Sequence, residues 1–488
     1  MKIYTIPSDL SKDICIKDVI ERCINDPLMN KISETKCKLD NNINLWDKAK
    51  KHINDYEYIY TSSQVNKNIS SICPVSRSFF KMREIVGDFN INVNGRIACI
   101  AEAPGGFIQC LRGYSDNIES IHGITLISDN KDVPFWNINL IKDELITTYP
   151  GKDETGDIYN IMNMLEFIKD VGKNTCTIVT SDGGFDYSGN FNDQELASYK
   201  LIRNEMFMAL NLQKTNGTFI CKIFDIFYYS TIQLLYLLYL SYNSVSFIKP
   251  YTSRPSNSEK YIVCRGFKGY NKYISNLLCS NLDNSILPIQ IPDDFIKVLN
   301  NYNETFIGLQ DKFITNGINL VRRRNISHHK PTEKQLQKGK DWCKKYKIPY
   351  LITRLPTIYG TYNRSEDAIS IFVKKALLNK DIIIHGTGEQ KRNFMHSIDV
   401  ALAICSLFQK KYNNKIISLL SNQTISIYKL AKKIVKITKS KSKIKKIVSA
   451  KRYDDFDFNP SKILKEKSKL IWRSKNRLDE NIKLMITK

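Results

Sequence analysis

The sequence has no pair or cluster of cysteines at the spacing that structural zinc requires. Its 12 cysteines are scattered, without a C-x-x-C pair and without a nearby group of histidines. The first residues lack the apolar core of a signal peptide, and the most apolar run, residues 226–242, is short and interrupted by tyrosine and serine. We therefore expect no metal site, no membrane contact, and a soluble protein in a reducing compartment, the cytoplasm or the nucleus.

The chain also has fewer acidic than basic residues. The chain has 73 lysines and arginines against 49 aspartates and glutamates, which gives a formal net charge of +24. Residues 429–488 alone hold 20 basic and 6 acidic residues. This excess favours a polyanionic partner such as nucleic acid, although an AT-rich genome would also enrich lysine.

The length of 488 residues exceeds the size at which a single core stops growing, so we expect two domains. From about residue 95, apolar strands alternate with helical stretches, which is typical of a doubly wound α/β sheet with helices on both faces. Residues 270–330 are Asn-rich and poorly periodic, which predicts a linker or an irregular extension. The expected strands are Arg96–Ala101, His122–Ile127, Thr175–Ser181, Gly217–Ile223, Ser244–Ile248 and Lys260–Arg265, and the expected helices are Gly105–Gly113, Gln194–Lys214 and Tyr228–Tyr242.

A glycine turn and three charged residues fall at strand ends of this predicted sheet. Gly105 and Gly106 follow the first strand, where glycines let a nucleotide-like ligand approach the backbone closely. Asp182 comes just after a later strand, Lys222 ends the next one, and Glu259 opens another. Because these positions share one edge of the sheet, we expect the three side chains to converge on the ligand crevice.

Residues 70–270 resemble the FtsJ-like family of ribose 2′-O-methyltransferases, especially the mRNA-cap branch of eukaryotes and large DNA viruses. This resemblance implies a Rossmann-like methyltransferase fold, S-adenosylmethionine as the cofactor, and methyl transfer to a ribose 2′-OH at the first transcribed nucleotides of capped mRNA. It also implies RNA as the partner, alongside other capping or transcription proteins. The matching stretches are EAPGGF at 102–107, SDGGF at 181–185, FICKIFD at 219–225 and KPYTSRPSNSEKYIVCRG at 249–266.

The family's catalytic set is Lys-Asp-Lys-Glu, and it maps in order onto Lys81, Asp182, Lys222 and Glu259. Lys222 is the candidate base, which must be neutral to accept the proton of the ribose hydroxyl. Burial beside a second cation, Lys81, would favour the neutral form. Asp182 and Glu259 would hold and orient the two lysines. Lys81 lies in a helix-like segment, where a solvated lysine is the simpler interpretation.

The resemblance also assigns residues to the cofactor. It places the 103–107 turn around the methionine and ribose part of S-adenosylmethionine, and an Asp in a Gly-Asp turn near the adenine, although such an Asp is structurally common. The stretch from 126 to 149 does not align with the family. The cofactor residues implied are Ala103, Pro104, Gly105, Gly106, Phe107 and Asp157.

A second resemblance covers residues 349–408, which are similar to the second half of NAD-dependent epimerases and dehydratases. The glycine-rich dinucleotide turn of that family has no counterpart upstream. Thr332 and Leu336 stand where its catalytic Tyr and Lys are expected. Arg392 matches a nucleotide-diphosphate contact of that family, but a solvated basic loop is the simpler interpretation. We therefore expect a truncated segment without dehydrogenase activity.

Five segments follow from these interpretations. Residues 1–70 are an N-terminal extension, 71–300 the methyltransferase domain, 301–331 a linker, 332–436 the epimerase-like segment, and 437–488 a basic tail. Three other functions stay open: methylation of ribosomal or transfer RNA, epimerisation of nucleotide sugars, and a non-catalytic RNA-binding role in a capping complex.

Overall fold

The structure is a computed structural model, and it divides the chain into two compact units. The first unit comprises Met1–Asn68 and Cys73–Tyr346, and the second comprises Ile69–Ile72 and Lys347–Lys488. The structure describes residues 2–38, 43–61, 68–184, 194–280, 286–322, 331–360, 367–407, 409–421, 424–447 and 478–486.

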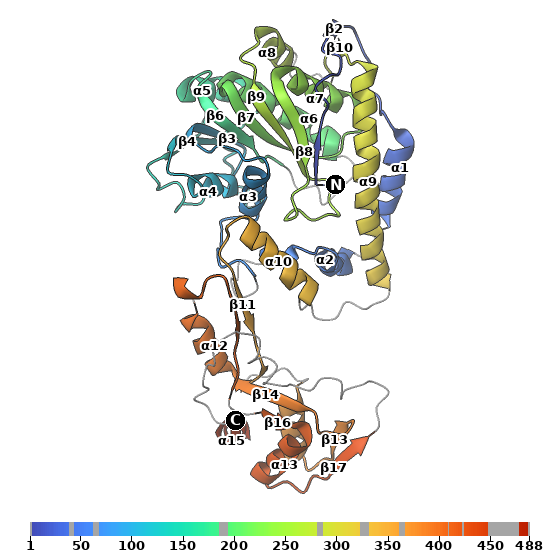
Figure 1. Cartoon of the computed structure of the whole chain (residues 1–488), viewed down its shortest axis with the longest axis vertical. Coiled ribbons are helices and arrows are strands. Elements are labelled where there is room, and N and C mark those ends of the chain that lie inside the picture. The colour runs from blue at the N-terminus through green and yellow to red at the C-terminus, as the bar shows by residue number, and fades with distance from the viewer. Residues whose placement is uncertain are drawn as a thin grey trace. The chain divides into compact units, whose positions relative to one another are not determined.

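The first unit is built on an eight-stranded sheet with the order β1-β8-β9-β7-β6-β3-β4-β5 (Figure 1). Strands β5, β4, β3, β6 and β7 are parallel to one another, and β9 runs antiparallel between β7 and β8. A doubly wound sheet of this kind binds ligands beyond the carboxyl ends of its parallel strands. The strands are β1 (Ile3–Thr5), β3 (Gly95–Ile100), β4 (Ile118–Ile124), β5 (Ile146–Tyr149), β6 (Cys176–Ser181), β7 (Gln213–Ile223), β8 (Tyr242–Ile248) and β9 (Lys260–Phe267).

Helices cover both faces of this sheet, because the central strands are apolar on both sides. On β3, Ala98 and Ile100 belong to the large core shared with α5, α6 and α7, while Ile97 and Cys99 are buried outside that core. On the side of α4, Ile108 approaches Gly123 of β4. The fold class is therefore the doubly wound α/β type, with helices on both faces of the sheet, that the sequence predicts. The helices are α3 (Ser78–Asp88), α4 (Gly106–Arg112), α5 (Ile161–Val171), α6 (Gln194–Leu212), α7 (Tyr229–Ser241) and α8 (Lys272–Cys279).

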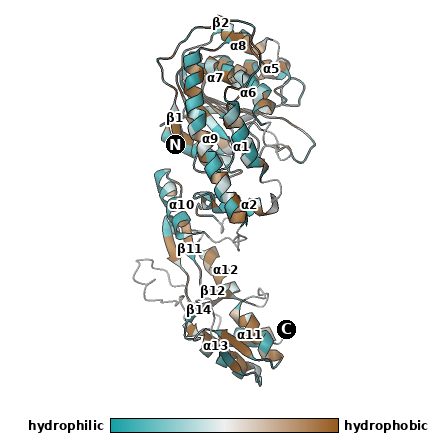
Figure 2. Ribbon diagram, turned by 90° about the vertical axis from the view of Figure 1, so that its right-hand side faces the viewer, coloured by the Kyte–Doolittle hydropathy of each residue, from teal (hydrophilic) through white to brown (hydrophobic). Residues whose placement is uncertain are grey.

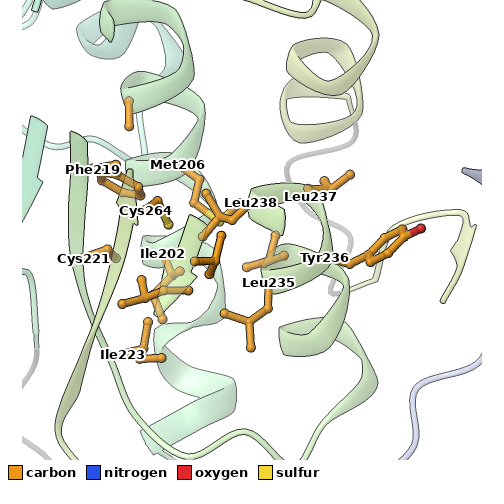
Figure 3. Close-up of a cluster of buried hydrophobic side chains, with 14 of the residues drawn as sticks. Ile202, Met206, Phe219, Cys221, Ile223, Leu235, Tyr236, Leu237, Leu238 and Cys264 are labelled. Carbon is orange, nitrogen blue, oxygen red and sulfur yellow. The ribbon is translucent and has the colours of Figure 1, made fainter. Parts of the chain in front are cut away.

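The centre of the large core lies between α6, α7 and strands β7 and β9 (Figure 3). Helix α7 is apolar on all sides and almost entirely buried, as expected for a helix inside a core rather than on a surface. On β7, Phe219, Cys221 and Ile223 all point into this core. Because side chains alternate along a strand, Lys222 is directed to the opposite face.

Most of the predicted strands agree with the structure within a few residues, but two begin earlier. β4 covers Ile118–Ile124 instead of His122–Ile127, and β7 starts at Gln213. In both cases the added residues include exposed polar side chains, Glu119 and Lys214. Strand pairing is made by the backbone, so a polar stretch can extend a strand without an apolar signal.

Where an irregular linker was expected, residues Asp293–Arg322 form the 30-residue helix α9. Its buried side chains recur at helical spacing, among them Phe295, Leu299, Tyr302 and Phe306, and they join the large core. Frequent asparagines mask this period in the sequence. Figure 2 shows α9 beside α1 (Asp26–Cys37), and α9 also contacts α2 (Ile43–His52).

The N-terminal region is also part of the first unit rather than an extension of it. Strand β1 pairs with β8 at the edge of the main sheet, and β2 (Cys15–Ile16) pairs with β10 (Ile289–Gln290). The 3-10 helix η2 (Glu57–Ile59) is fully buried. Helix α10 (Glu333–Lys345) likewise lies in the first unit, although the sequence groups it with the epimerase-like segment.

The second unit contains short paired strands around two small cores. Strand pairs β11 with β15, β12 with β14, and β13 with β17 are parallel, and β14 pairs with β16 in antiparallel fashion. The described part of the expected basic tail contributes to this unit, since Leu478 and Ile482 are core residues, while 448–477 lie outside the described residues. The elements are β11 (Leu351–Arg354), β12 (Thr357–Tyr359), α11 (Ala368–Leu377), β13 (Ile382–His385), β14 (Lys391–His396), α12 (Ser397–Ser406), η4 (Lys410–Tyr412), β15 (Lys415–Ser418), β16 (Thr424–Ser426), α13 (Ile427–Thr438), β17 (Ile444–Ile447) and α15 (Leu478–Ile486).

In the part of the chain that the structure describes, no helix combines the length and the apolar character needed to cross a bilayer.

Two glycines of α9 provide a matched test of its packing. A Cβ on the buried Gly317 would lie 2.3 Å from a ring carbon of Trp46, whereas a Cβ on the exposed Gly308 would meet nothing within 4 Å. Gly317→Ala should therefore lower the free energy of unfolding of the first unit by about 1–3 kcal/mol through overpacking. Gly308→Ala should raise it by up to about 1 kcal/mol through helix propensity. Denaturant titration followed by circular dichroism measures both, and equal shifts of the same sign would contradict the packing of α9 on α2.

Candidate functional site

The four charged candidates meet at the carboxyl edge of the main sheet as two ion pairs. Lys81 Nζ on α3 donates to Glu259 Oε2 at 2.8 Å. Lys222 Nζ at the end of β7 donates to the Asp182 carbonyl oxygen at 2.7 Å and lies 3.4 Å from Asp182 Oδ1. All four side chains are 13–15% exposed. The site is therefore mostly closed from solvent but still reachable.

Strand alternation explains why these groups share one face. Lys222 on β7 is the register partner of Tyr261 on β9, and both point away from the large core. The Tyr261 hydroxyl donates to Asp182 Oδ1 at 2.9 Å. Its ring also lies 5.9 Å from the Lys81 ammonium. Tyr261 thus links the two ion pairs, and the sequence reasoning did not single it out.

The two glycines after Asp182 occupy positions where a larger side chain would collide with the site. A Cβ on Gly183 would lie 2.5 Å from Glu205 Oε1, and one on Gly184 would lie 2.8 Å from Lys222 Nζ. A side chain at position 184 would press on the Lys222 ammonium group, and one at position 183 would press on the Glu205 carboxyl group. The last residue of the SDGGF stretch, Phe185, lies outside the described residues.

The charge state of Lys222 differs from the sequence-based expectation. Burial lowers the pKa of Lys222, as expected, but the carboxylates of Asp182, Glu259 and Glu205 outweigh burial and leave it raised above its ordinary value. The expectation that burial beside Lys81 would keep this lysine neutral is therefore wrong for the chain by itself. The chain holds Lys222 protonated.

Glu259 is the most strongly compensated carboxylate of the group. Burial opposes its charge, but Lys81, Lys222 and Lys249 together hold the pKa of Glu259 well below its usual range. Ser253 Oγ also donates to Glu259 Oε1 at 2.8 Å. Lys249 donates to the carbonyl oxygens of Asn257 and Glu259, and burial lowers the pKa of Lys249 to about 7. Glu259 is therefore ionised and fixed from several sides.

The glycine turn lies next to this cluster. Gly105 has a φ of 103°, a left-handed conformation that favours glycine. A Cβ on Gly106 would lie 2.1 Å from Ser78 Oγ, so the turn packs tightly against the start of α3. The ring of Phe107 lies 5.7 Å from that of Tyr261. The candidate cofactor turn and the ion pairs thus belong to one continuous site.

Glu102, which precedes the turn, supplies a polar group suited to a ligand. Its side chain is 4% exposed, and its Oε2 has no hydrogen-bond partner among the described residues. Burial raises the pKa of Glu102 well above its usual range, and the nearby Asp182 adds to this effect, while a hydrogen bond from Thr180 opposes it. An unpaired buried carboxyl beside a glycine turn fits a ligand that carries an amino group, as the methionine part of S-adenosylmethionine does.

The remaining cofactor candidates lie around the same edge. The peptide bond between Ala103 and Pro104 is cis, and the Pro104 carbonyl accepts from the Asn137 backbone at 3.2 Å. Asp157 Oδ1 accepts from the Tyr159 backbone at 2.8 Å, which is an Asx turn. Gly156 packs against the Thr125 carbonyl oxygen just beyond β4. The neighbouring Asp157 therefore lies near the end of that strand in space.

A buried carboxylate that the sequence reasoning missed holds two flanking arginines. Glu57 of η2 is 0% exposed and pairs with Arg77 at 3.2 Å and with Arg254 at 2.9 Å. Burial opposes the charge of Glu57, but Arg77 and Arg254 leave its pKa lowered. Arg77 stands four residues before Lys81, and Arg254 five residues before Glu259. No sequence signal marks Glu57, because its partners are distant in the chain.

The described residues contain no group of three or more His, Cys, Asp or Glu that could hold a metal ion. The cysteines of the described residues form no disulfide bonds with one another.

Comparison with known families agrees with this geometry. The FtsJ-like methyltransferase model matches residues 74–267, a range that contains the glycine turn and all four charged candidates. This segment is an FtsJ-like methyltransferase domain. The NAD dependent epimerase/dehydratase family model matches residues 337–419. The FtsJ-like domain and the epimerase-like segment expected from the sequence are both confirmed.

Several curated proteins resemble the FtsJ-like part of the chain. The cap-specific mRNA (nucleoside-2′-O-)-methyltransferase 1 of Mus musculus is 30% identical over 274 residues, covering 52% of this chain and 32% of that protein. The Homo sapiens protein of the same name is 31% identical over 258 residues, covering 48% and 31%. The Dictyostelium discoideum protein is 30% identical over 266 residues, covering 48% and 34%. The matched segment thus spans about a third of the length of these relatives.

Proposed function

We propose that the chain transfers a methyl group from S-adenosylmethionine to a ribose 2′-OH of RNA, at the first transcribed nucleotides of capped mRNA. The observation that carries this proposal is the pair of ion pairs beside the glycine turn, Lys81 with Glu259 and Lys222 with Asp182. The similarity to cap-specific methyltransferases supports the choice of the cap over ribosomal or transfer RNA. The net charge of +24 supports a polyanionic substrate.

Each residue of the set has a distinct task in this proposal. Lys222 accepts the proton of the ribose 2′-OH as the oxygen attacks. Asp182 and Tyr261 fix the position of Lys222, and Glu259 fixes Lys81 next to the acceptor. S-adenosylmethionine supplies an electrophilic methyl group on a positively charged sulfonium. Transfer of that methyl group to the ribose oxygen would release the hydroxyl proton to the nitrogen of Lys222.

The cofactor would lie along the glycine turn. Gly105 and Gly106 leave the backbone open to close approach, and Glu102 Oε2 is free to accept a hydrogen bond from an amino group. Asp157, beyond β4, is the candidate partner of the adenine side. Much of the rate would come from holding the hydroxyl and the methyl group within attack distance.

Lys222 must lose a proton before it can accept one, although the chain holds it protonated. A positive charge next to an ammonium group disfavours its protonated form. The sulfonium and Lys81 would act in this direction, against the carboxylates of Asp182 and Glu259. Lys222 would then be deprotonated only when the site is filled.

The first test replaces the proposed base. Lys222→Ala should reduce methyl transfer to capped RNA by at least about 100-fold, or roughly 2.7 kcal/mol, while calorimetry shows S-adenosylmethionine binding unchanged. Lys214→Ala, at the exposed beginning of the same strand, is the matched control and should retain full activity. The assay uses labelled methyl groups and nuclease digestion to locate the modified ribose. Activity of Lys222→Ala within about tenfold of the unaltered chain would exclude Lys222 as the base.

The raised pKa of Lys222 also predicts the pH dependence of the rate. The neutral fraction of a lysine rises with pH until the pKa is reached, and the neighbouring carboxylates hold this pKa above its ordinary value. The rate of methyl transfer at substrate concentrations far below saturation reports the ionisation of the free chain, so it should increase from pH 7 to pH 9 without a plateau. A rate that is independent of pH over this range would show that Lys222 is already neutral, or that it does not accept the proton.

A further inference from the structure

Helix α10 belongs to the methyltransferase unit in space, although in sequence it opens the epimerase-like segment. The epimerase family match begins at residue 337, inside this helix. The helix starts with a capping box in which the Thr332 side chain and Gln335 exchange hydrogen bonds, so it has a well-defined beginning of its own. Its partners are α3, which carries Lys81, and η2, which carries Glu57.

The first contact of α10 is with one face of α3. Trp342, 3% exposed, packs edge-on against Phe80 with ring centroids 5.8 Å apart. Arg83 donates to the Tyr346 carbonyl oxygen at 3.0 Å, and a Cβ on Gly87 would lie 2.9 Å from the Tyr346 ring. Positions 80, 83 and 87 share one side of a helix. α10 and Tyr346 therefore cover the side of α3 next to Lys81.

The last residue of α3, Asp88, is held to the same segment by a hydrogen bond and an ion pair. The Tyr346 hydroxyl donates to Asp88 Oδ1 at 2.8 Å and accepts from Lys2 at 2.7 Å. Lys345 also pairs with Asp88 at 2.7 Å. Burial disfavours the charge of Asp88, but Lys2 and Lys345 leave its pKa lowered. α3 is thus held at its end as well as along its side.

The second contact of α10 is with the residues around η2. Gln335, buried in the helix, donates to the Asn54 carbonyl oxygen at 3.0 Å. The Asn54 amide in turn donates to Glu57 Oε2 at 2.9 Å. Glu57 pairs with Arg77 and Arg254, whose segments carry Lys81 and Glu259. A second series of contacts therefore connects α10 to the ion pair of Lys81 and Glu259.

We propose that α10 and Tyr346 form a positioning element of the methyl-transfer site, holding Lys81 and Glu259 in register through α3 and through Glu57. This proposal rests on the proposed function. It implies that the catalytic unit extends past the FtsJ-like match to Tyr346, and that the epimerase-like match overlaps it. None of the α10 residues touches the reacting atoms, and they act through Lys81 and Glu259.

Variants of Trp342 in the full chain test the proposal. Trp342→Ala should lower the single-turnover rate of methyl transfer at least about tenfold, with S-adenosylmethionine affinity within about threefold of the unaltered chain. The S-adenosylmethionine affinity should be preserved because the glycine turn packs on Ser78, which is two residues from Phe80 and therefore faces the opposite side of α3. Trp342→Phe keeps an aromatic edge against Phe80 and should restore most of the rate. Lys344→Ala, exposed on the same helix, is the control and should change neither quantity.

A purely structural role of α10 predicts a different result. Trp342→Ala would then lower the melting temperature, while the rate of the folded fraction and the rate with Trp342→Phe would both equal that of the unaltered chain, and this result would overturn the proposal. If Trp342→Ala does not fold, Gln335→Ala removes the contact to Asn54 together with the capping-box bond to Thr332, and it should still lower the rate with S-adenosylmethionine binding intact. Unchanged activity of a folded Gln335→Ala would then count against the proposal.

Hydrogen exchange separates this proposal from the proposed function. In Trp342→Ala the amides of α3 around Lys81 should exchange faster, and those of α5 should not change. If the unaltered chain methylates no RNA, the proposed function fails, but faster exchange confined to α3 would still support the positioning role. Unchanged exchange in α3 would contradict it whatever the activity.

Discussion

The site depends on the mutual compensation of buried charges at the edge of the main sheet. Lys81, Lys222, Asp182 and Glu259 are largely removed from water, and an isolated charge in such a place is costly. Each charge has an opposite partner, and Tyr261 contacts both pairs, through its hydroxyl at Asp182 and through its ring beside Lys81. Removing one member would leave its partner unpaired, so each of the four residues depends on the others. The same carboxylates hold the pKa of Lys222 above its ordinary value.

Much of the first unit can be understood as support for these two pairs. Strand alternation brings Lys222 and Tyr261 to one face, the glycines at 183 and 184 leave room for them, and Ser253 holds Glu259. Around this centre lie elements that the FtsJ-like match does not include, namely η2 before it and α10 after it. Through these elements the N-terminal region and the residues up to Tyr346 become part of the same folded body.

The α/β sheet and the candidate residues could be predicted from the sequence because strand ends and motifs are local signals. Long-range partners have no such signal: Glu57 is separated from Arg254 by almost two hundred residues, and nothing near it marks a buried carboxylate. Helix α9 could not be recognised in the sequence because frequent asparagines interrupt the periodic pattern of its apolar residues. Phe295, Leu299 and Tyr302 nevertheless occur at helical spacing. The charge state of Lys222 was misjudged for a different reason. The number of carboxylates around a lysine depends on the fold, and Glu205 reaches the site from α6.

The proposed acceptor of the methyl group is a ribose 2′-OH in capped RNA. The most direct measurement compares methyl transfer to two capped RNA oligonucleotides that differ only in the sugars of the first two transcribed nucleotides, which are ribose in one and 2′-deoxyribose in the other. The proposed function predicts that label enters the first RNA and that incorporation into the deoxy substrate falls to background. Equal labelling of both would mean that the methyl group goes to a base or to the cap guanine, and it would contradict the roles proposed for Lys222 and its partners.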